Sequence, residues 1–175
     1  MSVVYVTSDW HIGHTGISEN FRKQFPTDDV HDQHIIYTMR SIVKKRDIMY
    51  VIGDVTWTTS GLQKIKDAEF PCKMVMVGGN HDTLPVQDYL EVFDEVVGVK
   101  RLSKGIFLTH IPIHRQELRY GDMKNVHGHC HRGGPWEQNK EPEYFNAILE
   151  YNDYLPVSVQ EVHAIMKERK ETCND

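Results

Sequence analysis

Three short runs of aliphatic and β-branched residues constrain the fold of this chain most strongly. They are Val3–Thr7, Ile48–Ile52 and Lys73–Val77. Each run is apolar on both faces, which is typical of a strand covered on both sides, as in a parallel sheet. Ile35 and Met39 recur at helical spacing between the first two runs, and a shorter amphipathic stretch follows the second. The order β-α-β-α-β predicts an α/β fold.

The ends of the predicted helices carry recognisable signals. We expect the first helix to begin at Asp28 and to end near Lys44–Arg46, because acidic and basic residues complement the two ends of the helix dipole. Ser60 is the expected N-cap of the second helix, and Pro71 follows that helix. Ser158 and Glu161 have the spacing of a capping box, which predicts a final helix.

From Glu95 onward the apolar runs become shorter, which predicts a second, more antiparallel region. The expected strands are Val96–Leu102, Ile106–Thr109, Val126–His127 and Tyr144–Tyr151, with Ser103–Gly105 as the turn of a hairpin. Two long polar segments rich in Gly and Pro, residues 13–27 and 132–143, are candidate substrate-shaping loops.

The composition limits the class of protein. A chain of 175 residues with 39% hydrophobic and 26% charged residues fits a single globular domain spanning residues 1–175. The three cysteines form no C-x-x-C pair, which argues against a disulfide framework and against a thiolate zinc site, and favours the cytoplasm. The amino terminus has neither a signal peptide nor a membrane span, so no membrane partner is expected.

The formal net charge is −5, which disfavours a protein that grips long duplex nucleic acid through its phosphates. Small phosphorylated compounds, nucleotides and single strands remain as partners. The composition does not indicate an oligomeric state.

Polar residues follow all three predicted parallel strands. Asp9, Asp54 and Asn80 each come after the carboxyl end of a strand, where open α/β sheets place their ligands. Any one of them is commonly just a turn or capping residue. Three strands of one sheet, however, would direct three such side chains to a single edge.

Histidines complete this set. Asp9 and His11 are two residues apart, so in an extended chain both side chains project to the same side and could grip one ion. His129 and His131 repeat the spacing and predict a second clamp, with Gly128 allowing a close backbone approach. His110 adds one more imidazole. Carboxylate, imidazole and amide ligands without a thiolate suit Mn²⁺, Fe²⁺ or Zn²⁺, and we rank Mn²⁺ first.

These clusters form an ordered series that resembles the calcineurin-like metallophosphoesterase superfamily, in particular its small bacterial and phage phosphoesterase branch. The series consists of Asp9-Trp10-His11, Gly53-Asp54, Gly79-Asn80-His81-Asp82, His110 and Gly128-His129-Cys130-His131. The resemblance covers nearly the whole chain, from Ser8–His14 to Tyr154–Ser158 before the last helix.

The resemblance implies a two-sheet α/β sandwich with flanking helices and a hydrolase with two divalent metal ions. It assigns Asp9, His11, Asp54 and His131 to one ion and Asp54, Asn80, His110 and His129 to the other, with Asp54 bridging. A hydroxide between the ions would attack the phosphorus in line. His81 would be the general acid, and Asp82 would either hold the tautomer of His81 or begin the following helix.

The substrate is less constrained than the chemistry. We expect a small phosphodiester or a nucleotide, although the motifs also fit a phosphomonoester. His14 and His114 either contact the substrate or are surface histidines, and Arg22 is either a phosphate contact or a solvated surface charge.

The residues also bear on functions other than hydrolysis of a small substrate. Asp54 is followed by Val55–Thr58 rather than by the Asp and Arg of protein Ser/Thr phosphatases, which disfavours that class. The alternative functions are a noncatalytic metal-binding scaffold and a sensor that binds a nucleotide. His81 argues against the scaffold, since scaffolds of this fold lose the catalytic imidazole.

Overall fold

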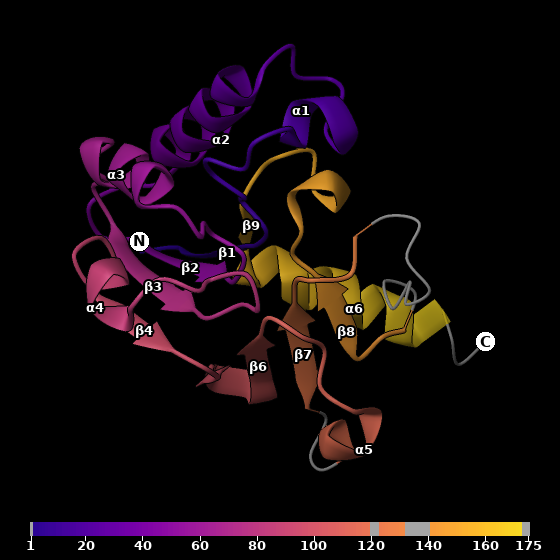
Figure 1. The fold of residues 1–175 in the computed structure, drawn as a ribbon. Helices are drawn as coiled ribbons and strands as arrows, with labels where there is room; N and C mark the ends of the chain where they lie inside the picture. Colours follow the sequence, from indigo (N-terminus) through magenta and orange to yellow (C-terminus); the bar gives the residue numbers. More distant parts are fainter. Residues whose placement is uncertain (1, 120–122, 132–140, 173–175) are drawn as a thin grey trace.

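The computed structural model describes residues 2–119, 123–131 and 141–172, and it contains two β-sheets with flanking helices (Figure 1). The first sheet has the order β4-β3-β2-β1-β9 and the second the order β5-β6-β7-β8. The predicted two-sheet α/β sandwich is therefore confirmed. None of the helices in the described part of the chain is both long and apolar enough to cross a bilayer.

Three of the five strands of the first sheet are the apolar runs that were predicted as its strands. Its strands are β1 (Val4–Thr7), β2 (Ile48–Ile52), β3 (Lys73–Val77), β4 (Glu95–Val97) and β9 (Val157–Ser158). Strands β1 to β4 pair in parallel, and β9 pairs antiparallel to β1. All the parallel strands therefore end at the same edge of the sheet.

One face of this sheet is covered by helices. Met49 and Val51 of β2 face a core that includes Ile35 and Met39 of α2 (Asp28–Ile42) and Ile65 of α3 (Thr59–Asp67). Each such side chain contributes about 1.5–3 kcal/mol when fully buried. The shorter helices are α1 (Ile17–Asn20), α4 (Val86–Tyr89) and α5 (Arg115–Leu118).

The other face of the sheet packs against the second sheet and α6 (Val159–Thr172). Tyr50 and Ile52 of β2 share a core with Leu108, Val126 and Met166, which come from β6, β7 and α6. Residues of β2 thus alternate between two cores, which explains why the strand is apolar on both faces.

The helix ends agree with the prediction in part. The capping box is confirmed, since Glu161 N–H donates to Ser158 Oγ at 3.1 Å and Ser158 N–H donates to the Glu161 carboxylate at 2.9 Å. Helix α2 begins at Asp28 as predicted but ends at Ile42, before the basic residues. The prediction of Ser60 as a cap is wrong, because the extended residue Thr58 accepts the N–H of Gly61 and caps α3.

The expected antiparallel character of the second region is wrong. The second sheet contains β5 (Lys100–Arg101), β6 (Ile106–Thr109), β7 (Lys124–His127) and β8 (Tyr144–Asn146). Only β5 and β6 are antiparallel, and they form the predicted hairpin, with Ser103–Gly105 as a 3₁₀ turn. After β6 the chain returns to the start of β7, where Ile113 N–H bonds the Asn125 side chain, so β7 runs parallel.

Two predicted strands are also shorter than expected. The run Val96–Leu102 is divided, because β4 belongs to the first sheet and β5 to the second. The run Tyr144–Tyr151 is a strand only to Asn146, whose side chain accepts the N–H of Ile148 and turns the chain into the 3₁₀ helix Leu149–Tyr151.

Candidate metal centre

The loops that follow β1, β2 and β3 meet those that follow β6 and β7, whose carboxyl ends point toward the first sheet (Figure 1). The structure brings the predicted ligands together there in two groups. The first group is Asp9, His11 and His131, and the second is Asp54, His110 and His129, with the ligand atoms of each group within 4.8 Å of one another. Asn80 joins the second group through its Oδ1, which is 3.0 Å from His110 Nε2.

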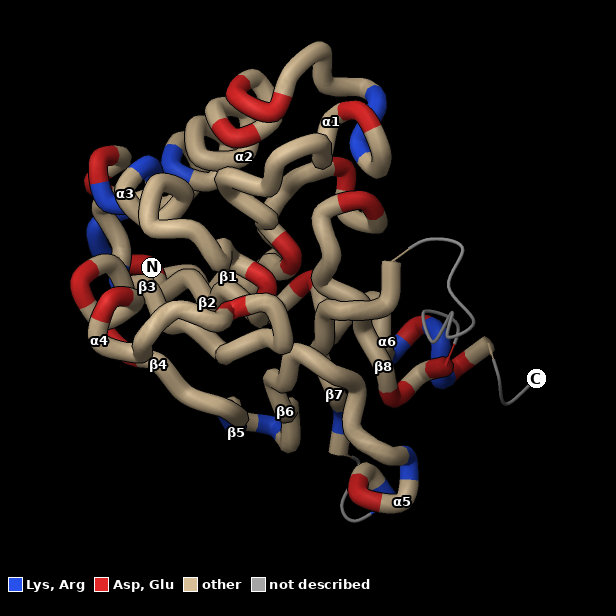
Figure 2. Tube along the Cα trace, in the orientation of Figure 1, with Lys and Arg blue, Asp and Glu red and all other residues tan. Residues whose placement is uncertain are grey.

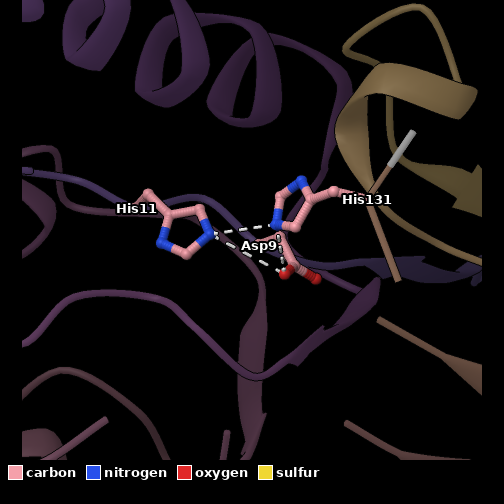
Figure 3. Close-up of side chains that lie close together, drawn as sticks. All are labelled: Asp9, His11 and His131. Carbon is pink, nitrogen blue, oxygen red and sulfur yellow. Dashed lines mark hydrogen bonds and ion pairs between the residues drawn. The ribbon is translucent and has the colours of Figure 1, made fainter. Parts of the chain in front are cut away.

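The first group surrounds one oxygen atom (Figure 3). Oδ1 of Asp9 lies 3.7 Å from His11 Nε2 and 3.2 Å from His131 Nε2, and the two nitrogens are 3.4 Å apart. This oxygen is buried and accepts no hydrogen bond from any described residue. A buried carboxylate oxygen left in this state is costly unless it meets a cation. One carboxylate oxygen and two imidazole nitrogens therefore fit a divalent metal ion.

The electrostatics of the first group also favour a cation. Burial opposes ionisation of Asp9, but the interactions with His11 and His131 outweigh it and hold the pKa of Asp9 well below its usual range. Burial likewise opposes the charge on His131, yet Asp9 and Glu150 raise the pKa of His131 to about 10. Two carboxylates thus hold positive charge at this position.

In the second group, His110 has a fixed orientation. Its Nδ1 donates to the carbonyl of Ile52 at 2.9 Å. In the neutral imidazole, Nε2 therefore carries the lone pair that can bind a metal ion. That atom lies 3.3 Å from Asp54 Oδ1, and the ring of His129 is 5.2 Å away. Burial opposes the protonation of His110, but Asp54 raises its pKa above the ordinary value.

The backbone at the predicted ligands is left-handed rather than extended. Asp9, His11, Asp54 and His129 have φ values of 58°, 53°, 50° and 66°. The assumption of an extended chain between Asp9 and His11 is therefore wrong, although the two side chains do converge. Each left-handed residue costs roughly 1–2 kcal/mol, and such strain is characteristic of functional sites.

His129 and His131 do not form a single clamp. His129 lies with Asp54 and His110, whereas His131 lies with Asp9 and His11. The left-handed turn at His129 separates the directions of the two imidazoles. The two histidines, which are two residues apart, thus contribute one imidazole to each group.

Close backbone packing holds the two groups beside each other. At Gly128 a Cβ would collide with Ser8 Oγ and Asp9 Oδ2, so the residue must be glycine. The next N–H, from His129, donates to Asp9 Oδ2 at 3.1 Å. The loop carrying Asp9 also pairs with the loop carrying Asp54, since His11 N–H donates to Asp54 O at 3.0 Å.

Asp82 binds the backbone of these loops. Its carboxylate accepts the N–H groups of Asp54, Val55 and Gly79 at 2.8–2.9 Å. Helix α4 begins only at Val86 and receives no side-chain cap, so the expectation that Asp82 begins that helix is wrong. These contacts give Asp82 a role in positioning Asp54, and its orientation of His81 stays a prediction.

His81 is exposed, and its ring lies near that of His11 in the first group. Its N–H donates to Asp54 Oδ1 at 2.9 Å, and its ring is 6.1 Å from that of His11. A group with this placement can exchange protons with solvent and reach a substrate bound beside the ligands. Its role as the general acid stays a prediction.

The three residues expected near the substrate have different positions. Arg22 is 1% exposed, and its guanidinium donates to the carbonyls of Asp9 and Trp10 at 2.6 and 3.1 Å. The expectation that Arg22 is a solvated charge or a phosphate contact is therefore wrong, because it supports Asp9 from inside the protein. His14 does lie at the site, with its ring 6.0 Å from that of His11.

His114 lies away from both groups. It is exposed and caps the short helix α5, where its Nδ1 accepts the N–H of Gln116. The preceding residue, Ile113, bonds Asn125 near the start of β7, at the opposite end of the strand from His129. Of the two candidate loops, 13–27 lies beside the site through His14, and residues 132–140 of the second lie outside the described part of the chain.

Two residues of the site were missed by sequence reasoning. Glu150 Oε1 lies 3.3 Å from His131 Nδ1 and 2.9 Å from Arg22 Nε. Trp57 lies with its ring 5.7 Å from that of His11. Trp57 comes three residues after Asp54, and this closeness to a predicted ligand could have identified it as a site residue. Glu150 could not be found in this way, because it lies in a run that was predicted as a strand.

The chain is similar to several known proteins. A family model for calcineurin-like phosphoesterases matches residues 2–168. An uncharacterised Methanocaldococcus jannaschii protein, MJ1445, is 25% identical over 100% of this chain and 98% of its own length. The gene 66 protein of Mycobacterium phage D29 is 32% identical over 75% of this chain and 79% of its own.

A solved structure is also similar. The protein of unknown function AQ665 from Aquifex aeolicus superposes with a TM-score of 0.73 at 26% identity, over 94% of this chain and 100% of that one. The similarity thus extends over the whole sandwich.

Proposed function

The chain belongs to the calcineurin-like phosphoesterase family, and on that premise we propose that it hydrolyses a small phosphodiester or nucleotide with two bound divalent metal ions. The observation that carries the proposal is the pair of ligand groups at one sheet edge. The buried Asp9 Oδ1, which accepts no hydrogen bond within the described residues, adds specific support.

We assign the ligands as follows. Asp9, His11 and His131 hold one ion, Asn80, His110 and His129 hold the other, and Asp54 is shared. Sharing is supported by the backbone pairing of the Asp9 and Asp54 loops, which sets Asp54 beside the first group as well as in the second.

Two divalent ions in such a site supply a nucleophilic water and neutralise the charge on the phosphoryl oxygens. The mixed oxygen and nitrogen donors suit Mn²⁺ first, with Fe²⁺ and Zn²⁺ as alternatives.

His81 donates the proton to the leaving oxygen in this proposal. It is exposed beside the first group and bound through its N–H to Asp54, so it is held close to the reacting phosphate. General acid catalysis of this kind contributes roughly 10²–10⁴ in rate. Asp82 acts through the backbone, by holding Asp54 in place.

The proposed substrate is small, and the proposed location is the cytoplasm. Lysine and arginine lie mainly on the periphery of the molecule, whereas acidic residues lie near the ends of β1 and β2 (Figure 2). Among the described residues, this distribution provides no continuous basic surface that could bind the phosphates of long duplex nucleic acid. The location is proposed from the cysteine pattern, which contains no C-x-x-C pair.

The test measures metal content and Mn²⁺-stimulated hydrolysis of a chromogenic phosphodiester beside the matching monoester. We expect the diester to be the better substrate and EDTA to abolish activity. His81→Ala should reduce the rate by about 10²–10⁴-fold, whereas His163→Ala, on α6, should leave it unchanged. Activity that survives both EDTA and His81→Ala contradicts the proposal. Metal binding without hydrolysis of any nucleotide would favour the scaffold or the sensor.

A further inference from the structure

A row of aromatic side chains leads from the first ligand group to the protein surface. We define the aromatic row as His81, Trp57, His14 and Phe21. The centroid distances are 5.3 Å from His81 to Trp57, 4.7 Å from Trp57 to His14, and 5.9 Å from His14 to Phe21. The ring of Trp57 is also 5.7 Å from that of His11, so the row begins at a predicted metal ligand.

The aromatic row is accessible to a ligand. Phe21 is 73% exposed, His81 is exposed, and His14 and Trp57 are half-buried. An exposed phenylalanine and a half-buried tryptophan that both contact His14 beside a reactive site are more characteristic of a binding surface than of a core.

The backbone around Trp57 is held firmly. Asp82 accepts the N–H groups of Val55 and Thr56, and the hydroxyl of Tyr89 donates to the carbonyl of Thr56 at 2.6 Å. On the other side of Trp57, Thr58 caps α3. Such anchoring preorganises the indole, which lowers the entropy lost when a ligand stacks on it.

The segment carrying the other half of the row is anchored as well. The Asp28 carboxylate accepts the N–H groups of Gly16 and Ser18 at 2.7 and 3.0 Å. Within the same segment the N–H of Phe21 donates to Ile17 O. His81 comes from a third segment, after β3, where its N–H donates to Asp54 Oδ1. The row is therefore built on three anchored backbone segments that are distant in sequence.

We propose that the aromatic row binds the base of a nucleotide whose phosphate lies at the ligand groups. The inference rests on the proposed function and specifies its substrate class. A nucleobase is a flat ring that stacks on aromatic faces. The histidines can also donate N–H hydrogen bonds to the heteroatoms of the base. The row contains no lysine or arginine, so it is unsuited to further phosphates.

The position of His81 indicates which part of the substrate occupies the row. His81 is both the proposed proton donor and a member of the row, so the nucleoside is the leaving group. The water oxygen bonds to phosphorus and the phosphorus–oxygen bond to the nucleoside breaks. His81 gives its proton to the departing oxygen, and the proton lost by the attacking water returns to solvent.

Binding is tested by calorimetry on the Mn²⁺-loaded protein with adenosine 5′-monophosphate and ribose 5-phosphate, which lacks the base. We expect the nucleotide to bind at least about 10-fold more tightly, the size expected of one base stacked on one aromatic ring. Trp57→Ala should abolish that difference without changing ribose 5-phosphate binding, and Trp57→Phe should restore most of it. Tyr37→Ala, an exposed aromatic on α2, is the matched control.

The outcomes separate this inference from the proposed function. Equal binding of the two phosphates, unaffected by Trp57→Ala, overturns the aromatic row as a base site even if the protein hydrolyses phosphodiesters. Preferential binding that depends on Trp57 supports the row even if no nucleotide is hydrolysed, in which case only the proposed function fails. An alkyl phosphate that binds as tightly as the nucleotide, with the same dependence on Trp57, overturns the assignment to a nucleobase.

Discussion

The carboxylate of Glu150 lies 3.3 Å from Nδ1 of His131, and its same oxygen atom is 2.9 Å from Nε of Arg22. The His131 imidazole therefore contacts the Glu150 carboxylate through Nδ1, while its Nε2 faces Asp9. A carboxylate in this position fixes the tautomer and orientation of a ligating histidine and makes it more basic. Interaction with His131 and Arg22 outweighs the opposing effect of burial and lowers the pKa of Glu150 to about 2.

We predict that Glu150→Gln weakens metal binding at the first group. An amide supports the ligand histidine less well than a carboxylate, and such substitutions reduce metal affinity by roughly 10–100-fold. Titration calorimetry with Mn²⁺ measures the change. Glu168→Gln, an exposed position on α6, is the matched control and should leave the affinity unchanged. Unaltered affinity in Glu150→Gln would show that Glu150 does not support His131.

Substitutions at Asp82 and His81 should affect different properties. We expect a loss of thermal stability at Asp82 and a loss of catalytic rate at His81. Asp82→Ala leaves the N–H groups of Asp54, Val55 and Gly79 without their acceptor, which should cost about 3 kcal/mol. Tm should fall by roughly 6–12 °C. His81→Ala removes an exposed ring and should leave Tm nearly unchanged while activity falls. Thermal melts of the two variants test this, and a stable Asp82→Ala protein would contradict it.

Asp28 should make the loop beside the site sensitive to acid. Hydrogen bonds from the Ser18 side chain, then from the Ser18 and Gly16 backbone, lower the pKa of Asp28 to about 2 from the ordinary 3.8. Because the folded pKa is the lower one, the stabilisation is present above 3.8 and is lost as pH falls through about 2. At neutral pH, Asp28→Asn should reduce Tm by about 2–4 °C, corresponding to about 1 kcal/mol.

The Tm difference between wild type and Asp28→Asn should therefore shrink as the pH falls from about 4 to about 2. Asp29→Asn is the control. Its carboxylate is 76% exposed and pairs with Lys64, so its removal should change Tm little at any pH. A Tm difference at Asp28 that does not depend on pH would contradict the assignment.

Asp54 and Asn80 test how the ions are shared. If Asp54 serves both ions, Asp54→Asn should reduce the bound metal from two equivalents toward zero. Asn80→Ala removes an amide that contacts His110 of the second group and should leave one equivalent bound. Elemental analysis after dialysis gives both values, and the loss of a single equivalent from Asp54→Asn would contradict sharing.

The sequence was sufficient for the three central strands of the first sheet, β1, β2 and β3, because the information for them is local. Each strand of the run from Val3 to Val77 carries its own apolar pattern, and Asp9, Asp54 and Asn80 follow the strand ends. The direction of β7 could not be read in this way. It depends on the path by which the chain returns from the end of β6 to the start of β7, which no periodicity encodes.

The same limit applies to the site. The ordered motifs identified the ligands as a set, but the left-handed turns at Asp9, His11 and His129 decide which side chains converge. Arg22 reads as a surface charge because arginine is rarely buried. Only the fold shows that Glu150, 128 residues away, is its partner.

Each ligand group draws its members from both sheets, since Asp9 and His11 follow β1 whereas His131 follows β7. An ion bound there would link the first sheet to the second and so stabilise their packing. At a free concentration of 100 times its Kd, one such ion adds about 2.7 kcal/mol to the free energy of unfolding. The supply of metal in the cell would then govern how long the folded protein survives, and starvation for metal would remove the protein along with its proposed activity.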